Sequence, residues 1–391
     1  MSKRVLVIGH KNPDTDSICS AIAYANLKNQ LTEDKHVAKR AGDISDETKF
    51  VLEKFHIETP GYIQDVGTQV KDIDIRKTEG VLNSISLKKA WNLMRDLKVA
   101  TLPVTSRKRL EGLISVKDIA TANMDIYDNR ILATAKTSYK NIIETLGGTM
   151  IVGDENDIVE DGKILIAASN PDTLESFIDP GDIIILSNRY ESQLCAIEMN
   201  AGCIIVCTGA PVSMTIKSMA KEKSCRIIST PYDTYIVARL INQSTPISYF
   251  MRKENLITFE TDDFTEDVKR IMAKVRHRDF PVSDVHGDYF GMISRRSLLD
   301  VQKKQIILVD HNEKSQAVDG LDSAEIMEII DHHRLGSLET ISPVFFRNQP
   351  VGCTATIVYQ MYLESRIEIR PDIAGLLCAA IITDTLRFRS P

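Results

Sequence analysis

The sequence predicts an α/β protein in which a parallel sheet is interrupted by a long inserted region. Three observations support this prediction. Short apolar runs followed by helical periodicity occupy both ends of the chain, at about residues 1–60 and 305–391. An internal repeat and a further series of strand-like runs lie between them. Because the end segments share one pattern, they are expected to form one domain that tolerates the insertion at a surface loop.

The first apolar run, at residues 5–8, leads to His10, Asp14 and Asp16 and then to a helix expected to begin near Ser17. A strand-to-helix loop of an open α/β sheet is where ligands usually bind. An imidazole and two carboxylates within seven residues indicate a divalent metal between them. The alternative is a polar turn in which Asp16 or Ser17 caps the helix.

Three later apolar runs end in the same way, with Asp or His following directly. The runs lie at residues 305–309, 326–330 and 376–382, and they lead to Asp310, to Asp331, His332 and His333, and to Asp384. Side chains at the carboxyl ends of several strands of one sheet can converge on one point. This geometry suits a two-metal centre, with carboxylates bridging ions about 3.5–4 Å apart.

From about residue 62 the pattern changes to strand, helix, strand, turn, strand and helix, and it returns near residue 256. The expected elements are strands at 81–86, 100–105 and 112–116 with a helix at 87–98, and strands at 256–259, 279–283 and 291–294 with a helix at 265–275. Such an internal repeat should pack as a pseudo-symmetric pair.

Between the repeats, four strand-like runs alternate with helix-like segments. They lie at residues 164–168, 182–186, 202–207 and 226–228. This alternation predicts a parallel sheet. The turn at residues 208–211 is interpreted as structural, and no chemistry is assigned to this unit.

Composition excludes several classes of function. A net charge of −6 argues against a nucleic-acid-binding surface. The apolar runs fall short of the roughly 18 residues that a membrane span needs, and no signal core follows the first methionine. Seven scattered cysteines without a Cys-x-x-Cys pair indicate reduced thiols in a cytoplasmic protein. A metal role for Cys203 and Cys207 is the weaker interpretation, because both lie in an apolar run.

Four segments, at residues 10–17, 309–313, 331–333 and 383–385, resemble the motifs of family II manganese-dependent inorganic pyrophosphatases, within the Asp-His-His (DHH) phosphoesterase superfamily. The resemblance implies hydrolysis of pyrophosphate to two phosphates by a metal-activated hydroxide, with two Mn²⁺ or Co²⁺ ions per site and Mg²⁺ bound to the substrate. It implies the following roles by position: His10 and Asp14 hold one metal, Asp16 and His332 the other, Asp310 and Asp384 touch one or both, and His333 contacts the substrate phosphate. Asp16, Asp310 and His333 are therefore the catalytic candidates.

Both copies of the repeat resemble CBS domains, which pair to bind adenine nucleotides. The resemblance implies regulation by AMP, ADP, ATP or a diadenosine polyphosphate, with these contact candidates: Thr101, Leu102, Pro103, Ser115, Lys117 and Asp118 in the first copy, and Arg278, Asp279, Phe280, Pro281, Ser294, Arg295 and Arg296 in the second. Ser297 stands where a ribose-binding aspartate is expected. The arginines suit phosphates, or they form a solvated face.

The middle unit is similar to a DRTGG domain in position and strand pattern, although the DRTGG letters are absent. The expected domains are 1–61 and 305–391 (DHH catalytic domain), 62–129 and 245–304 (CBS domains) and 130–244 (DRTGG-like). The family continues into a second catalytic domain that binds substrate, whereas this sequence stops at Pro391. We therefore expect metal and nucleotide binding with weak or absent turnover, and a homodimer.

Two other functions remain open at this point. The first is another phosphoesterase of the superfamily, either an exopolyphosphatase or an oligonucleotide phosphodiesterase. Asn12 and Thr15 within the first motif favour the pyrophosphatase over both. The second is a non-catalytic sensor of adenine nucleotides that keeps a vestigial metal site.

Overall fold

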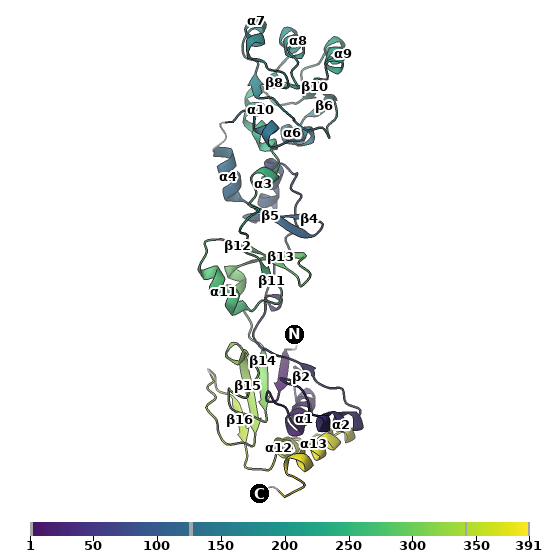
Figure 1. Cartoon of the computed structure of the whole chain (residues 1–391), viewed down its shortest axis with the longest axis vertical. Helices are drawn as coiled ribbons and strands as arrows, with labels where there is room; N and C mark the ends of the chain where they lie inside the picture. Colours follow the sequence, from purple (N-terminus) through teal and green to yellow (C-terminus); the bar gives the residue numbers. More distant parts are fainter. Residues whose placement is uncertain (1–2, 125–127, 300, 341, 390–391) are drawn as a thin grey trace. The chain divides into compact units, whose positions relative to one another are not determined.

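The computed structural model describes residues 3–124, 128–299, 301–340 and 342–389, and it divides into two compact units (Figure 1). The first unit comprises Met1–Asp74, Asp262–Arg276 and Arg295–Pro391, and the second comprises Ile75–Thr261 and His277–Ser294. Both ends of the chain thus belong to one unit. Ser390 and Pro391, on which the expectation of a missing domain rests, lie outside the described residues.

A six-stranded parallel sheet forms the centre of the first unit, in the order β16-β15-β14-β1-β2-β3. Its strands are β1 (Arg4–Ile8), β2 (Lys35–Arg40), β3 (Gly61–Tyr62), β14 (Gln305–Val309), β15 (Glu325–Asp331) and β16 (Phe345–Asn348). After β1 the chain adds β2 and β3 toward one edge of the sheet, and after β14 it adds β15 and β16 toward the other edge. The carboxyl ends of these two neighbours therefore frame the crevice in which open α/β sheets bind ligands.

Alternating side chains of β1 and β14 bury both faces of this sheet. Val7 and Ile307 pack on one face against helices α1 (Thr15–Leu31), α12 (Thr354–Ser365) and α13 (Pro371–Asp384), which Figure 1 shows beside one another. Ile8 and Leu308 belong to a second core on the other face. The remaining elements of this unit are α2 (Asp46–Lys54), α11 (Thr265–Ala273) and the 3-10 turns η1 (Val70–Asp72), η5 (Arg295–Leu298) and η6 (Leu321–Ser323).

The run at residues 376–382 is a helix, so its interpretation as a strand was wrong. It forms the last part of α13, which begins at Pro371, a residue whose fixed φ suits the first helical position. Leu376, Leu377 and Ala380 are buried, and this spacing is that of one helix face. A continuous apolar run matches a buried strand and a buried helix equally well, which explains the error.

Two smaller expectations were also wrong. Residues 81–86 form no regular strand: Val81 and Ser86 make only isolated bridges, to Val104 and Pro246. Helix α1 begins at Thr15 instead of near Ser17, so Asp16 lies within the helix and not on the loop before it.

The described part of the second unit contains three sheets. The five-stranded sheet has the order β6-β10-β9-β8-β7 and is parallel except for its edge strand β6, in agreement with the predicted βα pattern. The strands of this unit are β4 (Thr101–Ser106), β5 (Arg109–Ser115), β6 (Thr149–Val152), β7 (Ile164–Ile166), β8 (Ile183–Leu186), β9 (Cys203–Val206), β10 (Arg226–Ser229), β11 (Phe259–Glu260), β12 (Asp279–Ser283) and β13 (Tyr289–Ser294).

The helices of the second unit complete this α/β architecture. They are α3 (Leu87–Asp96), α4 (Val116–Met124), α5 (Ile131–Thr134), α6 (Tyr139–Leu146), α7 (Pro171–Leu174), α8 (Tyr190–Glu198), α9 (Met214–Glu222) and α10 (Thr234–Leu240), with 3-10 turns η2 (Glu175–Phe177), η3 (Ile241–Ser244) and η4 (Ile247–Tyr249). Among the described residues, no helix combines the length and apolar character that a membrane span requires.

The two copies of the repeat contact each other through their hairpins, β4-β5 and β12-β13, where the Tyr289 amide donates to the Lys108 carbonyl over 2.8 Å. The Thr101 hydroxyl donates to Asp279 Oδ2 over 3.2 Å, and these two residues occupy equivalent positions at the start of β4 and β12. The copies differ after the hairpin, where the first continues into helix α4 and the second into the short turn η5.

Candidate metal centre

His10 and Asp310 meet because their strands are neighbours. Strand β1 pairs with β14 in a register that places Ile8 opposite Leu308, so the residues that follow the two strands lie side by side. His10 Nε2 lies 3.4 Å from Asp310 Oδ2 and 3.7 Å from Asp14 Oδ2. Segments from opposite ends of the chain therefore share one cluster of polar side chains.

Asp310 adopts a left-handed backbone conformation, with φ of +67°. Such a conformation is unfavourable for residues with a Cβ atom, although aspartate tolerates it better than most. The Asp310 amide still donates to the Ile330 carbonyl over 2.8 Å, so the residue remains attached to β15 while the chain turns away. The carboxylate is 2% exposed.

His332 presents one ring nitrogen to the cluster. Its Nδ1 lies 2.9 Å from the Val351 carbonyl, so Nδ1 carries the proton and donates. Nε2 lies 3.5 Å from Asp310 Oδ1 and 3.7 Å from Asp384 Oδ2. Metal-binding histidines commonly donate one ring nitrogen to a carbonyl and direct the other toward the ion, and His332 is oriented in this way.

The two aspartates near the start of α1 have different surroundings. Asp14 is the N-cap of α1: its Oδ1 accepts from the Ser17 amide over 2.8 Å, so neither Asp16 nor Ser17 caps this helix. Asp16 is buried within the helix, and its carboxylate accepts hydrogen bonds from the Thr354 amide, the Ala355 amide and the Ser20 hydroxyl, at 2.6, 2.9 and 2.8 Å.

Among the residues that the structure describes, potential ligand atoms form three overlapping groups, in each of which they lie within 4.8 Å of one another. The groups are His10, Asp14 and Asp310; Asp16, His332 and Asp384; and Asp310, His332 and His333. All six residues predicted to bind metal occur in these groups, and all lie in the first unit. Asp384 reaches the cluster from the carboxyl end of α13 instead of a strand. That these residues bind metal remains a prediction.

The carboxylates are crowded, and their pKa values reflect this. Burial raises the pKa of Asp384 to about 6, and the charges of Asp16 and Asp14 contribute. Burial and neighbouring carboxylates also raise the pKa values of Asp16 and Asp310. Burial alone would lower the pKa of His10, but hydrogen bonds to Asp14 and Asp310 raise it to about 10. Concentrated negative charge with imidazole and carboxylate donors fits divalent Mn or Co.

The residues predicted to contact nucleotide lie around the two hairpins. Ser115 ends β5, and both its amide and its hydroxyl donate to Asp118 Oδ2, over 2.8 and 2.6 Å. Asp279 is buried between Thr101 and Arg76, whose guanidinium lies 3.0 Å from Asp279 Oδ1. The other candidates are placed as follows: Leu102 and Pro103 in β4, Lys117 in α4, Arg278 exposed before β12, Phe280 and Pro281 in β12, and Ser294 at the end of β13.

Arg295 and Arg296 are the exceptions among these candidates. They belong to η5 in the first unit, whereas the other candidates belong to the second. Arg295 donates to the backbone carbonyls of Met272 and Val275. Within the first unit, this arginine is thus engaged with the chain itself.

Comparison with known proteins accounts for this combination of features. Residues 4–381 match the DHH family, N-terminal domain. The chain belongs to the DHH family. This DHH-family chain is 41% identical, over all of its length and 71% of the relative, to the cobalt-dependent inorganic pyrophosphatase of Clostridium perfringens. It is 36% identical, over 99% of its length and 71% of the relative, to a protein of Thermotoga maritima named "Probable manganese-dependent inorganic pyrophosphatase".

A solved structure covers the inserted region of this DHH-family chain. It contains the CBS and DRTGG domains of the regulatory region of the C. perfringens pyrophosphatase, complexed with the activator diadenosine tetraphosphate. The similarity has a TM-score of 0.56 and 37% identity, and it covers 58% of this chain and 100% of that one. The predicted family and fold class are thereby confirmed.

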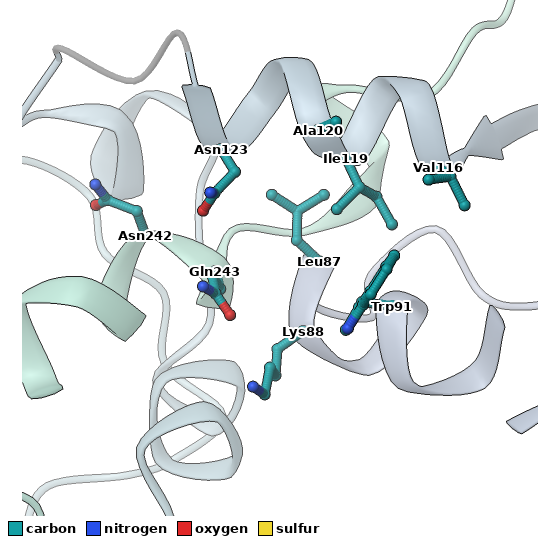
Figure 2. A pocket seen from close by; sticks show the side chains of 9 residues that line it. All are labelled: Leu87, Lys88, Trp91, Val116, Ile119, Ala120, Asn123, Asn242 and Gln243. Carbon is teal, nitrogen blue, oxygen red and sulfur yellow. The ribbon is translucent and has the colours of Figure 1, made fainter. Parts of the chain in front are cut away.

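A cavity of about 360 Å³ lies elsewhere in the DHH-family chain, between α3, α4 and η3 (Figure 2). Figure 2 shows Leu87 and Trp91 of α3 pointing toward Ile119 of α4, with the polar groups of Lys88 and Gln243 at the edge. None of the residues predicted to bind nucleotide lines it. Its lining residues had no predicted function.

Sequence reasoning assigned no role to several residues that hold the metal-centre side chains in place. Asp331 accepts from the His333 ring over 2.9 Å and from the His332 amide over 2.8 Å, and Asn312 also donates to it. Asp331 and Asn312 lie inside recognised motifs, so the motifs could have identified them. Thr354 stands outside the motifs, and no local pattern distinguishes it from an ordinary first helical residue.

Proposed function

We propose that this chain is the catalytic and regulatory part of an inorganic pyrophosphatase that hydrolyses pyrophosphate to two phosphates under the control of adenine nucleotides. The single observation that carries the proposal is the convergence of His10, Asp16, Asp310, His332 and Asp384 in a chain 41% identical throughout to a cobalt-dependent inorganic pyrophosphatase. The proposed domains are 1–61 with 305–391 for catalysis, 62–129 and 245–304 for the CBS pair, and 130–244 for the DRTGG-like domain.

We assign the ligands as two sets. His10 and Asp14 bind one Mn²⁺ or Co²⁺ ion, Asp16 and His332 bind the other, and Asp310 and Asp384 contact one or both. Three overlapping donor groups within 4.8 Å support two neighbouring ions. When bound, two such cations activate water and neutralise phosphate charge. Imidazole with carboxylate is a donor set that suits these metals.

His333, oriented by Asp331, is proposed to contact the substrate. Asp331 holds the His333 ring at Nδ1 over 2.9 Å, and this hydrogen bond raises the pKa of His333. The His333 side chain is 49% exposed, against 15% for His332. An accessible imidazole with a raised pKa next to the metal ligands is suited to donate a hydrogen bond to a phosphate oxygen of the substrate, with Mg²⁺ offsetting the rest of the substrate's charge.

The test of this function begins with the wild-type chain. Isothermal titration with Mn²⁺ should give two sites per chain, and phosphate release should be greater from pyrophosphate than from tripolyphosphate or a short oligonucleotide. Removal of metal with EDTA should abolish release. Binding of fewer than two ions, or preference for either of the longer substrates, would contradict the proposal and favour another phosphoesterase or a sensor.

We propose that AMP, ADP, ATP or a diadenosine polyphosphate binds the CBS pair through the hairpin residues. Support comes from the 37% identity to a regulatory region complexed with diadenosine tetraphosphate. A nucleotide can change activity only through different affinities for two states of the protein.

Replacing Asp118 by Ala should weaken AMP binding about tenfold or more, since a charged hydrogen-bond acceptor for ribose is lost, at a cost of about 1.5–3 kcal/mol. Isothermal titration measures the effect. Asp96→Ala is the matched control, because Asp96 is another aspartate of this unit with a side chain 67% exposed. Thermal melts verify that Asp118→Ala, which also loses its bonds from Ser115, is folded. Unchanged AMP affinity in a folded variant would remove Asp118 from the site.

We propose further that the chain is a homodimer in the cytoplasm. Strand β16 is an edge of the six-stranded sheet, and its residues Phe345 and Phe346 are 49% and 43% exposed. Exposed apolar edges favour pairing with another chain. Six of the seven unpaired cysteines are buried, which fits a reducing compartment. Light scattering should give twice 43.8 kDa, and Phe346→Lys should shift the mass toward one chain. A wild-type mass of 43.8 kDa would contradict the dimer.

A further inference from the structure

Thr354 contacts two of the proposed metal ligands at once. Its amide donates to Asp16 Oδ2 over 2.6 Å, and its hydroxyl donates to Asp310 Oδ1 over 2.9 Å. Thr354 is fully buried, so neither bond competes with bulk water. The two carboxylates come from different elements, helix α1 and the end of strand β14. One residue of α12 therefore links side chains that no local structure would hold together.

The first turn of α12 is built around Asp16. Cys353, the N-cap of α12, makes no side-chain capping bond, and the amides of Thr354 and Ala355 instead donate to the two Asp16 oxygens. Free amides at a helix N-terminus need such acceptors. The Ser20 hydroxyl completes the set of donors to Asp16. This arrangement fixes the plane of the Asp16 carboxylate.

The hydroxyl of Thr354 fixes the orientation of the Asp310 carboxylate in the same way. Asp310 Oδ1 lies 3.5 Å from His332 Nε2, while Oδ2 lies 3.4 Å from His10 Nε2. The two oxygens therefore face different donor groups. A hydrogen bond to Oδ1 from a buried hydroxyl restricts rotation of the carboxylate, so each oxygen stays directed toward its own group.

We propose that Thr354 is a positioning residue of the metal centre, which aligns Asp16 with Asp310 so that both cations can be bound together. The proposal rests on the proposed two-metal function. Groups that hydrogen-bond metal ligands without touching the metal commonly change affinity by about 10–100-fold when removed. Thr354 is thus expected to act on metal affinity, through the carboxylates.

The test compares Mn²⁺ binding by the full chain and three variants. Thr354→Val keeps the amide and the side-chain shape but removes the hydroxyl, and should weaken Mn²⁺ binding about tenfold or more, by analogy with other outer-shell groups. Thr354→Ser should restore affinity to about the wild-type value. Thr356→Val is the matched control: it makes the same change in the same helical turn, where the hydroxyl lies 3.1 Å from Cys353 Sγ.

Each outcome bears on the proposal. Loss of affinity in Thr354→Val, with rescue by Ser and none lost in Thr356→Val, supports it. Wild-type affinity in Thr354→Val overturns it while leaving the two-metal site intact. If Thr354→Ser loses affinity as Val does, the hydroxyl alone does not sustain Mn²⁺ binding and the loss reflects altered packing of the side chain, which also overturns the proposal. A wild-type chain that binds no Mn²⁺ would overturn the proposed function as well. Melting curves in EDTA identify any variant that is unfolded, in which case Thr354→Ser alone decides.

Discussion

Replacement of Asp310 by Asn is expected to abolish binding of both Mn²⁺ ions and to lower any pyrophosphate turnover by about a thousandfold. At about 1.36 kcal/mol per factor of ten, this loss corresponds to about 4 kcal/mol of transition-state stabilisation. Asp310 belongs to two of the three donor groups, and its oxygens face His10 and His332 separately. An amide has similar shape but carries no charge and presents only one oxygen. Both ion sites should therefore be affected.

The measurement for Asp310→Asn is the Mn²⁺ stoichiometry from isothermal titration, followed by phosphate release from pyrophosphate. Asp322→Asn is the matched control, since Asp322 lies in the same unit with a side chain 77% exposed. The control should bind two ions with unchanged affinity. Retention of one tightly bound Mn²⁺ by Asp310→Asn would show that the carboxylate serves a single ion, and retention of both would remove it from the site.

The affinity for Mn²⁺ should rise steeply with pH. In the metal-free chain the pKa of Asp384 is raised to about 6 and that of His10 to about 10, and a metal must displace a proton from each protonated ligand. Each displaced proton adds about a factor of ten in affinity per pH unit. Asp384 and His10 together therefore contribute a slope of about two decades per unit from pH 5 to 6, and His10 alone contributes about one decade per unit from pH 6 to 8.

Stability without metal should change in the opposite direction. Between pH 4 and 6 the folded state holds the Asp384 proton that the unfolded state has lost, so the free energy of unfolding falls as the pH rises through that range. His10 acts with the same sign: its contribution is complete below its ordinary pKa of 6.5 and is lost toward pH 10.

Titrations at pH 5, 6, 7 and 8, with calorimetry in EDTA, measure both trends. The increase in melting temperature caused by Mn²⁺ should grow from pH 5 to pH 8. Asp384→Asn should reduce the slope of log affinity below pH 6 by about one decade per unit, because one displaced proton is removed. A wild-type affinity that is independent of pH between 5 and 7 would contradict the raised pKa values of Asp384 and His10.

The central strands of the six-stranded sheet could be predicted from sequence because their apolar runs are clear. Residues 5–8 and 305–309 are apolar, short and followed by polar residues, and the structure places them as neighbours β1 and β14. The family motifs then selected His10, Asp310 and His332, which the structure brings into one cluster. Both signals are strong because burial constrains the residues of the apolar runs and the chemistry of the site constrains the residues that follow them.

The rest depended on information that local patterns lack. The run at residues 376–382 is apolar on every side, so period alone could not distinguish the helix it forms from a strand. Thr354 could not be identified, because its importance lies in contacts to Asp16 and Asp310, which are distant in sequence. The alternative interpretation named Asp16 or Ser17 as the helix cap, whereas Asp14 is the cap, because the position of a cap depends on backbone geometry at one residue.

The pairing of β1 with β14 has a consequence for folding during synthesis on the ribosome. At a typical 5–20 residues per second, roughly 15–60 s separate the emergence of these two strands, during which β1 waits without its central partner. Asp384 emerges later still. We therefore expect the cations to bind late in maturation, well after the intervening segments have had time to fold. Until β14 is synthesised, chaperones are expected to bind the nascent amino-terminal segment.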